Sequence, residues 1–133
     1  DTVKPGLVHY DIGDCVRSCC NPAGEETLCL DDVRFDMGLC EAILTGYLSV
    51  AGEFLSEWEL HYLPHCIRLI PLELGLRFLT DHLEGDVYFR CDRHGHNLQR
   101  ALVQFRLTEA VEQQFNALEQ LVARLKQQPN PNL

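Results

Sequence analysis

The sequence predicts a mainly helical fold, and three segments with regular apolar spacing carry that prediction. In residues 35–51, 65–85 and 97–126, apolar side chains recur every three or four residues, which is the period of an α-helix with one buried face. The stretch TLCLDDV, residues 27–33, is the one strand-like signal, and we expect at most a brief extended segment there. At 133 residues the chain forms one domain at most.

The first segment, DTVKPGLVHYDIGD, combines a turn signal with a possible helix start. We expect residues 1–10 to form a loop, because Pro5-Gly6 favours a turn. Asp11 is placed to cap a short helix that runs to about Cys20, since a carboxylate can accept the free N–H groups of a first turn.

Two helices are expected in the middle of the chain. The first occupies residues 35–51 and ends at Gly52, and its apolar face is formed by Leu39, Ile43, Tyr47 and Val50. The next begins at Ser56, and Pro64 is expected to interrupt it, because proline lacks the N–H that a helix interior uses.

The longest apolar segment, residues 65–85, is predicted to be a core helix that stops at Gly85. Arg68 and Glu73 interrupt the apolar run, which argues against a membrane span. One flank is expected to be buried, and a second apolar stripe lies beside it. The flank comprises Leu69, Leu72, Leu76, Leu79 and Leu83, and the second stripe comprises Ile67, Ile70, Leu74 and Phe78.

The last predicted helix spans residues 97–126 and carries a regular apolar stripe. This stripe could pack inside its own domain or form a short coiled-coil seam with a partner helix. Residues 127–133 are expected to be a flexible tail. The stripe comprises Val111, Phe115, Leu118, Val122 and Leu125.

Charge and cysteine usage restrict the classes of partner. The chain has 11 Lys and Arg residues against 20 Asp and Glu residues, a formal charge of −9, so it should repel nucleic-acid phosphates and anionic lipids. We therefore expect neither nucleic acid nor membrane as a partner. The seven cysteines are odd in number and form no C-x-x-C pair, which favours reduced thiols and a cytoplasmic protein.

Two groups of residues are candidate metal ligands. Cys91, His94 and His96 offer three possible zinc ligands without a nearby fourth, and the alternative interpretation is a polar, histidine-rich loop. Asp1 could supply a carboxylate to magnesium, which prefers oxygen ligands supplemented by water and substrate phosphates.

A narrow polar strip on the core helix is the main candidate binding feature. Glu73, Arg77 and Asp81 are spaced four residues apart, so they lie along one side of an otherwise apolar helix. They could form an ion ladder facing solvent. Alternatively, they border a cleft in which Arg77 presents its guanidinium group to a ligand oxygen, with Tyr88 near the rim of a sugar or small polar-ligand site.

Two stretches resemble a known family. DTVKPGLVHYDIGDCVRS is similar to the segment that follows the catalytic loop in the aminoglycoside phosphotransferase and choline kinase-like superfamily. LELGLRFLTDHLEGDVYFR and GHNLQRALVQF resemble the branch that contains N-acetylhexosamine 1-kinase. The resemblance covers the chain from Asp1 to about Leu125.

The resemblance implies that the chain is the helical, acceptor-binding part of the C-terminal lobe of a protein kinase-like phosphotransferase. The nucleotide lobe and catalytic loop would then lie outside these 133 residues, with ATP and Mg²⁺ bound by the full-length parent and not by the fragment. Asp1 would be an auxiliary acid near the metal, and Asp11 would brace the catalytic loop. Arg77 and Tyr88 would contact the sugar.

The expected function is therefore that of a fragment, inactive alone, of an ATP-dependent kinase that phosphorylates a small-molecule acceptor. A sugar hydroxyl, as in N-acetylhexosamine, is the expected target, although an amino alcohol would also suit the superfamily. The alternative is a non-catalytic helical interaction module. In either case exposed apolar surface would favour self-association.

Overall fold

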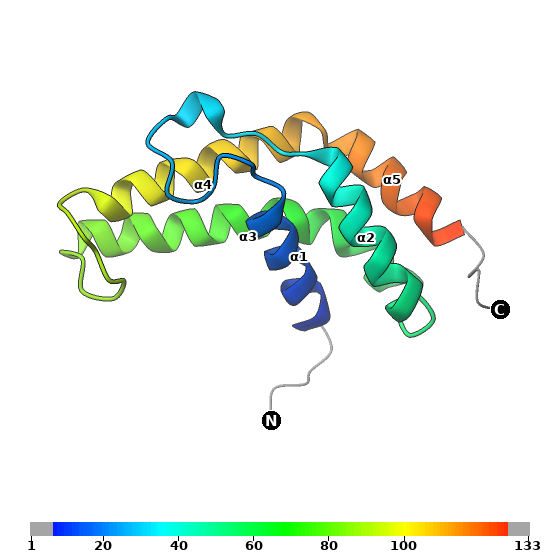
Figure 1. Ribbon diagram of the computed structural model, residues 1–133. Coiled ribbons are helices and arrows are strands. Elements are labelled where there is room, and N and C mark those ends of the chain that lie inside the picture. The colour runs from blue at the N-terminus through cyan, green and yellow to red at the C-terminus, as the bar shows by residue number, and fades with distance from the viewer. Residues whose placement is uncertain (1–6, 128–133) are drawn as a thin grey trace.

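A computed structural model of the chain describes residues 7–127 and the side chains of residues 10–127. This part is helical without strands, which confirms the mainly helical prediction (Figure 1). The brief extended segment that was possible at residues 27–33 is limited to Cys29 and Val33, which are extended on either side of a 3₁₀ turn at Leu30–Asp32 and form no strand. The elements are α1 (Leu7–Cys19), η1 (Leu30–Asp32), α2 (Met37–Ala51), α3 (Glu57–Leu83), α4 (His96–Gln113) and α5 (Phe115–Gln127).

The two longest helices, α3 and α4, lie side by side and form the base of the fold (Figure 1). Helix α1 packs on α3, and α2 packs against both α1 and α5. The core lies where these helices meet. Its fully buried members include Val16, Leu44, Leu63, Ile67, Leu107 and Leu118.

Helix α3 runs without a break through Pro64 and Pro71, so the predicted interruption at Pro64 is wrong. Both prolines are buried and are seven residues apart, which places them on the same face of the helix. Packing of the two rings in the core offsets the backbone hydrogen bonds that they cannot make. The helix begins at Glu57, one residue after the predicted start, and Ser56 is its N-cap in a capping box with Glu59.

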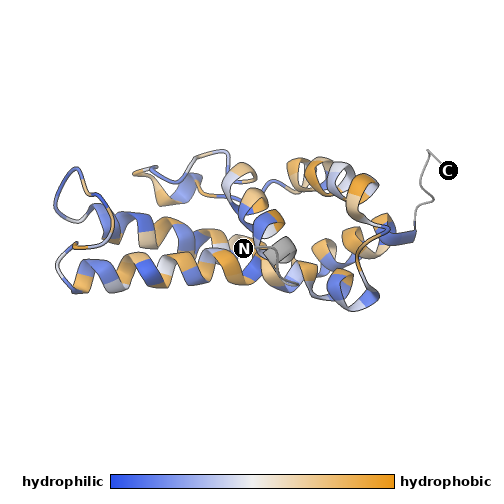
Figure 2. Cartoon of the chain, turned by 90° about the horizontal axis from the view of Figure 1, so that it is seen from below, coloured by the Kyte–Doolittle hydropathy of each residue, from blue (hydrophilic) through white to orange (hydrophobic). Residues whose placement is uncertain are grey.

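The buried face of α3 is the second apolar stripe, not the flank predicted to be buried. Ile67 and Ile70 are 1% and 5% exposed, whereas Leu69 and Leu76 are about half exposed. Two apolar stripes make the helix apolar on most sides, so periodicity alone could not select the face that α4 covers. Hydrophobic residues of α3 therefore remain exposed. Figure 2 shows hydrophobic and hydrophilic residues alternating along the helices of the fold.

Helix α1 begins at Leu7, so the prediction that Asp11 caps it is wrong. Asp11 lies within the helix and is exposed. The helix still ends near the predicted position, before Asn21-Pro22. The predicted flexible tail, residues 127–133, lies outside the described residues except for Gln127, which ends α5.

The single helix predicted over residues 97–126 is two helices, α4 and α5, that meet at Gln114. The side-chain amide of Gln114 donates a hydrogen bond to the carbonyl of Phe35 at 3.0 Å, which ties the junction to the segment before α2. The break lets α5 reach α2, and the apolar stripe packs inside the domain. Val111, Leu118, Val122 and Leu125 are buried in this way.

The end of α3 leads into the connection that carries the candidate site. The helix stops at Leu83, next to the predicted stop Gly85, which has a φ of +97° that glycine adopts without strain. Asp86 also has a positive φ, +61°. These two residues turn the chain back towards the start of α4.

In residues 7–127 we found no helix long and apolar enough to cross a membrane.

A cavity at the end of α3

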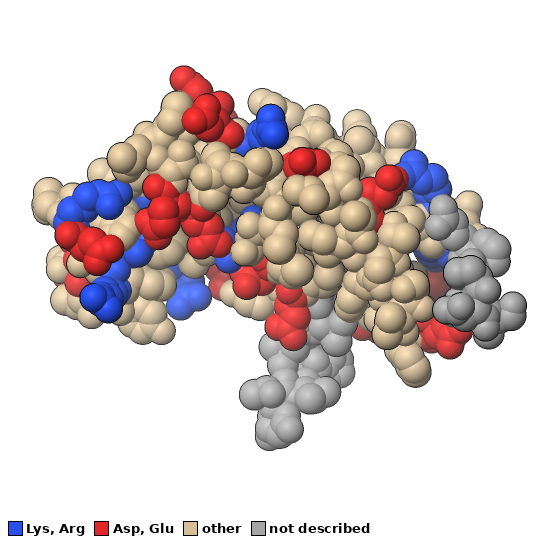
Figure 3. Space-filling view, viewed as in Figure 1, with Lys and Arg blue, Asp and Glu red and all other residues tan. Residues whose placement is uncertain are grey.

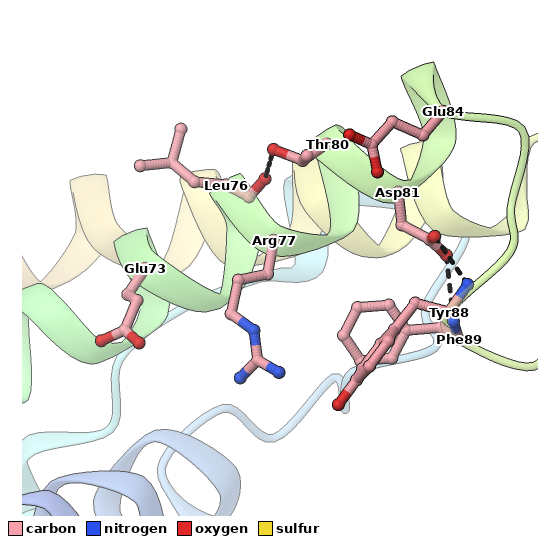
Figure 4. A pocket seen from close by; sticks show the side chains of 8 residues that line it. All are labelled: Glu73, Leu76, Arg77, Thr80, Asp81, Glu84, Tyr88 and Phe89. Carbon is pink, nitrogen blue, oxygen red and sulfur yellow. Dashed lines mark hydrogen bonds between the residues drawn. The ribbon is translucent and has the colours of Figure 1, made fainter.

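A cavity of about 470 Å³ lies between the C-terminal part of α3 and the connection that follows it (Figure 4). The helix contributes polar and apolar side chains, and the connection contributes two aromatic rings. The lining residues are Glu73, Leu76, Arg77, Thr80, Asp81, Glu84, Tyr88 and Phe89.

The guanidinium group of Arg77 lies beside both aromatic rings of the connection. Its central carbon is 5.9 Å from the centre of the Tyr88 ring and 5.7 Å from that of Phe89, within the range of a cation–π contact. We found no hydrogen bond or ion pair from Arg77 to any described side chain or carbonyl. Among the described residues its five N–H donors therefore have no acceptor, and they are available to a ligand oxygen.

The ion-ladder interpretation of the polar strip is wrong for the part of the chain that the structure describes. Neither Glu73 nor Asp81 forms an ion pair with Arg77, and Asp81 is only 3% exposed. The Glu73 side chain points to the same side of α3 as Arg77 (Figure 4). Of the two interpretations that the spacing left open, the one that fits the geometry is a strip bordering a cleft.

Asp81 holds the backbone of the connection through both carboxylate oxygens (Figure 4). Its Oδ1 accepts hydrogen bonds from the amides of Val87 at 3.1 Å and Tyr88 at 2.8 Å. Its Oδ2 accepts from the amide of Phe89 at 3.0 Å and from the Nδ2 of Asn97 at 2.7 Å. Three consecutive backbone amides are thus fixed by one buried carboxylate.

These bonds also determine the charge of Asp81. Burial on its own would raise the pKa of the carboxyl group, but the amides of Phe89, Tyr88 and Val87 and the side chain of Asn97 outweigh it. The net result is a pKa below the ordinary value for aspartate. Asp81 is therefore ionised at neutral pH and accepts all four hydrogen bonds as a carboxylate.

A second set of contacts secures the start of α4 behind this connection. Arg100 donates to the Asn97 side-chain oxygen at 3.0 Å, to the Arg90 carbonyl at 2.9 Å and to Glu26 at 3.1 Å. His96 is 2% exposed and its Nε2 lies 2.6 Å from a Glu26 oxygen. The hydrogen bonds of Asp81 therefore hold the connection just after α3, and those of Glu26 and Arg100 hold it near the start of α4.

The predicted zinc ligands do not form a site. Across residues 10–127 no three Cys, His, Asp or Glu side chains are grouped closely enough to hold a metal ion. Both ring nitrogens of His96 are already used, because Nδ1 accepts from the Asp92 amide and Nε2 contacts Glu26. The interpretation of this stretch as a polar loop is also incomplete, since His96 is buried and begins α4.

Of the four residues to which the family resemblance gave roles, the structure brings together two. Arg77 and Tyr88 both line the cavity. Asp11 lies on α1 and is not a lining residue, and Asp1 lies outside the described residues. Sequence reasoning missed the role of Asp81 and the second aromatic ring, Phe89. A clue was the closeness of Asp81 to a turn signal at Gly85, since a carboxylate before a turn often accepts amides that follow it.

The surface charge in the view of Figure 3 is mixed. Asp and Glu side chains are distributed over this face, and Lys and Arg form small separate groups between them. This face has no continuous basic surface.

No protein-family model matches the chain.

Proposed function

We propose that this chain is the acceptor-binding part of an ATP-dependent small-molecule kinase, and that the acceptor is a sugar of the N-acetylhexosamine type. The proposal joins the sequence resemblance to the cavity at the end of α3. It includes a cytoplasmic location, where ATP is abundant.

The observation that carries the proposal is the open guanidinium group of Arg77 beside the exposed ring of Tyr88. A pyranose presents C–H groups on its faces and hydroxyl or carbonyl oxygens at its edges. An aromatic ring suits the first, and a planar guanidinium fork suits the second. The cavity is within the volume range of small-molecule sites.

The lining also contains acceptors for sugar hydroxyl groups. Glu73 and Glu84 are exposed at the cavity, so their carboxylates can accept hydrogen bonds from hydroxyl donors. Arg77 lines the same cavity, so the lining contains both hydrogen-bond donors and hydrogen-bond acceptors. This combination favours neutral polyols over anionic acceptors.

In the proposed reaction, a sugar hydroxyl oxygen forms a bond to the γ-phosphorus of ATP as the bond to the β–γ bridging oxygen breaks, and ADP leaves. The hydroxyl proton passes to a base in the catalytic loop that the resemblance places outside this chain. The residues of the cavity bind and orient the acceptor, which supplies the positional part of catalysis. Since the described residues contain no cluster of metal-ligating side chains, we assign them no magnesium site.

A helical interaction module is the second candidate, and one surface favours it. Phe54, Trp58 and Tyr62 are 82%, 70% and 50% exposed, and the rings of Trp58 and Tyr62 stack with their centres 6.0 Å apart. Exposed aromatic residues of this kind are frequent at protein interfaces. If the chain is part of a larger enzyme, however, these three side chains could instead pack against another part of that enzyme.

The test is a phosphoryl-transfer assay with two proteins. The full-length gene product is expected to convert ATP to ADP in the presence of N-acetylglucosamine or N-acetylgalactosamine, while the 133 residues alone are expected to show no turnover above a protein-free control. Phosphate transfer by the 133 residues alone would contradict the division of roles. Absence of transfer by the full-length protein to any sugar or amino alcohol would favour the interaction module.

A further inference from the structure

Asp81 differs from the other polar residues of the cavity because its carboxylate is turned into the protein. It is 3% exposed, and among the described residues its carboxylate accepts hydrogen bonds from the connection and from α4. A ligand in the cavity would meet Arg77 and Tyr88 first. Any effect of Asp81 on that ligand would therefore be exerted through the residues that it holds.

The residues held by Asp81 include the aromatic wall of the cavity. Its carboxylate accepts hydrogen bonds from the backbone amides of Val87, Tyr88 and Phe89. Phe89 in turn packs against Phe78 on α3, with ring centres 4.6 Å apart, and lies edge-on to the Tyr88 ring at 4.9 Å. The Tyr88 ring is 74% exposed, so few other contacts fix where it stands.

The connection needs such an anchor because its turn is not a low-energy one. Asp86, just before the three amides, has a φ of +61°, which a residue with a side chain adopts at a cost. Asn97 offsets this cost by donating to both Asp86 at 3.0 Å and Asp81 at 2.7 Å. Without the Asp81 carboxylate, three backbone amides would lose their acceptor together, and the Asn97 side chain would keep only its hydrogen bond to Asp86.

We propose that Asp81 is a positioning residue for the sugar substrate. Its carboxylate fixes the backbone of residues 87–89, so that the Tyr88 ring stands beside the guanidinium group of Arg77. This inference rests on the proposed function, since it assigns acceptor affinity to the cavity. The claim that Asp81 fixes the position of the Tyr88 ring can be tested without any sugar.

The decisive variant is Asp81→Asn in the full-length protein. Asparagine keeps the size of the side chain but replaces one acceptor oxygen with an NH₂ group, which would face the donors of Phe89 or Asn97. The matched control is Asp92→Asn. Asp92 is exposed on the same connection, and its carboxylate has no hydrogen bond or ion pair to the described residues.

We expect Asp81→Asn to raise the KM for N-acetylhexosamine at least tenfold while the KM for ATP and kcat stay within twofold. Amides 87–89 should exchange with solvent faster, and the Tyr88 ring signals in the NMR spectrum should move towards those of a free tyrosine. Asp92→Asn should change none of these. A variant with Val122→Ala, chosen for a comparable loss of Tm at a buried site on α5, should leave the sugar KM unchanged.

Two outcomes would overturn the proposal. One is an unchanged sugar KM in Asp81→Asn, or an equal rise in the KM values for sugar and ATP. The other is an unchanged Tyr88 signal with unchanged amide exchange, which would show that Asp81 does not hold the ring. If the wild-type protein phosphorylates no sugar, the proposed function fails, and the Tyr88 signal and amide exchange still decide whether Asp81 positions the ring.

Discussion

Under the proposed function, replacement of Arg77 by alanine in the full-length kinase is expected to weaken acceptor binding by about 1–3 kcal/mol. This corresponds to a rise of about 5- to 150-fold in the dissociation constant for N-acetylhexosamine. The reason is that the guanidinium group has no ion pair with the described residues, so its donors are free for the ligand and their loss leaves ligand oxygens unpaired. Calorimetric titration of the sugar, with a parallel titration of ATP, measures both affinities.

The controls separate a local effect from a general one. Arg77→Lys keeps the positive charge but loses the planar fork, so we expect an intermediate loss. Arg124→Ala removes an arginine that is paired with Glu41 on α2 and does not line the cavity, so it should leave both affinities unchanged. Equal loss of sugar and ATP binding in Arg77→Ala, or loss of neither, would contradict the role assigned to Arg77.

Replacement of Gly75 by alanine is expected to lower the stability of the protein. Gly75 is buried where α3 crosses α4, and a Cβ added there would stand 2.6 and 2.8 Å from ring carbons of Phe105 and 3.2 Å from the Cβ of Gln104. The ring can move, but the Cβ of Gln104 moves only with the backbone of α4. Overpacking of this kind typically costs about 1–3 kcal/mol.

Gly46→Ala is the matched control for this prediction. Gly46 lies within α2, and a Cβ added there meets nothing within 4 Å. Its replacement should therefore stabilise the helix by up to about 1 kcal/mol, the difference in helix propensity between the two residues. Urea unfolding of both variants tests the packing of α3 on α4. A Gly75→Ala variant as stable as Gly46→Ala would show that the two helices do not approach so closely.

The helical class and most element positions could be predicted because the signals are local. Apolar spacing located the helices, and Ser56 and Gly85 located two of their ends. Local signals failed where tertiary packing decides the outcome. Pro64 breaks an isolated helix but is accepted in α3, where its ring is buried, and the junction at Gln114 depends on a contact with Phe35, which is 79 residues away in the sequence.

In the candidate site, too, local sequence signals predicted some positions and tertiary contacts decided the others. The four-residue spacing placed Arg77 on one side of α3, and the position of Tyr88 just beyond the helix end placed it at the same rim. Asp81 has the same spacing as Arg77, yet it faces inward because three amides of the following turn and Asn97 are available to it. That choice depends on the path of the connection, which helix periodicity does not specify.

The most direct test of acceptor binding in this cavity is an NMR titration of the full-length protein with N-acetylhexosamine, followed at residues that are assigned by mutation. At saturation, the Nε–H signal of Arg77 and the ring signals of Tyr88 are expected to shift, while the indole signal of Trp58, at the start of α3, stays in place. Saturable binding that shifts Trp58 and leaves Arg77 and Tyr88 unchanged would contradict the account.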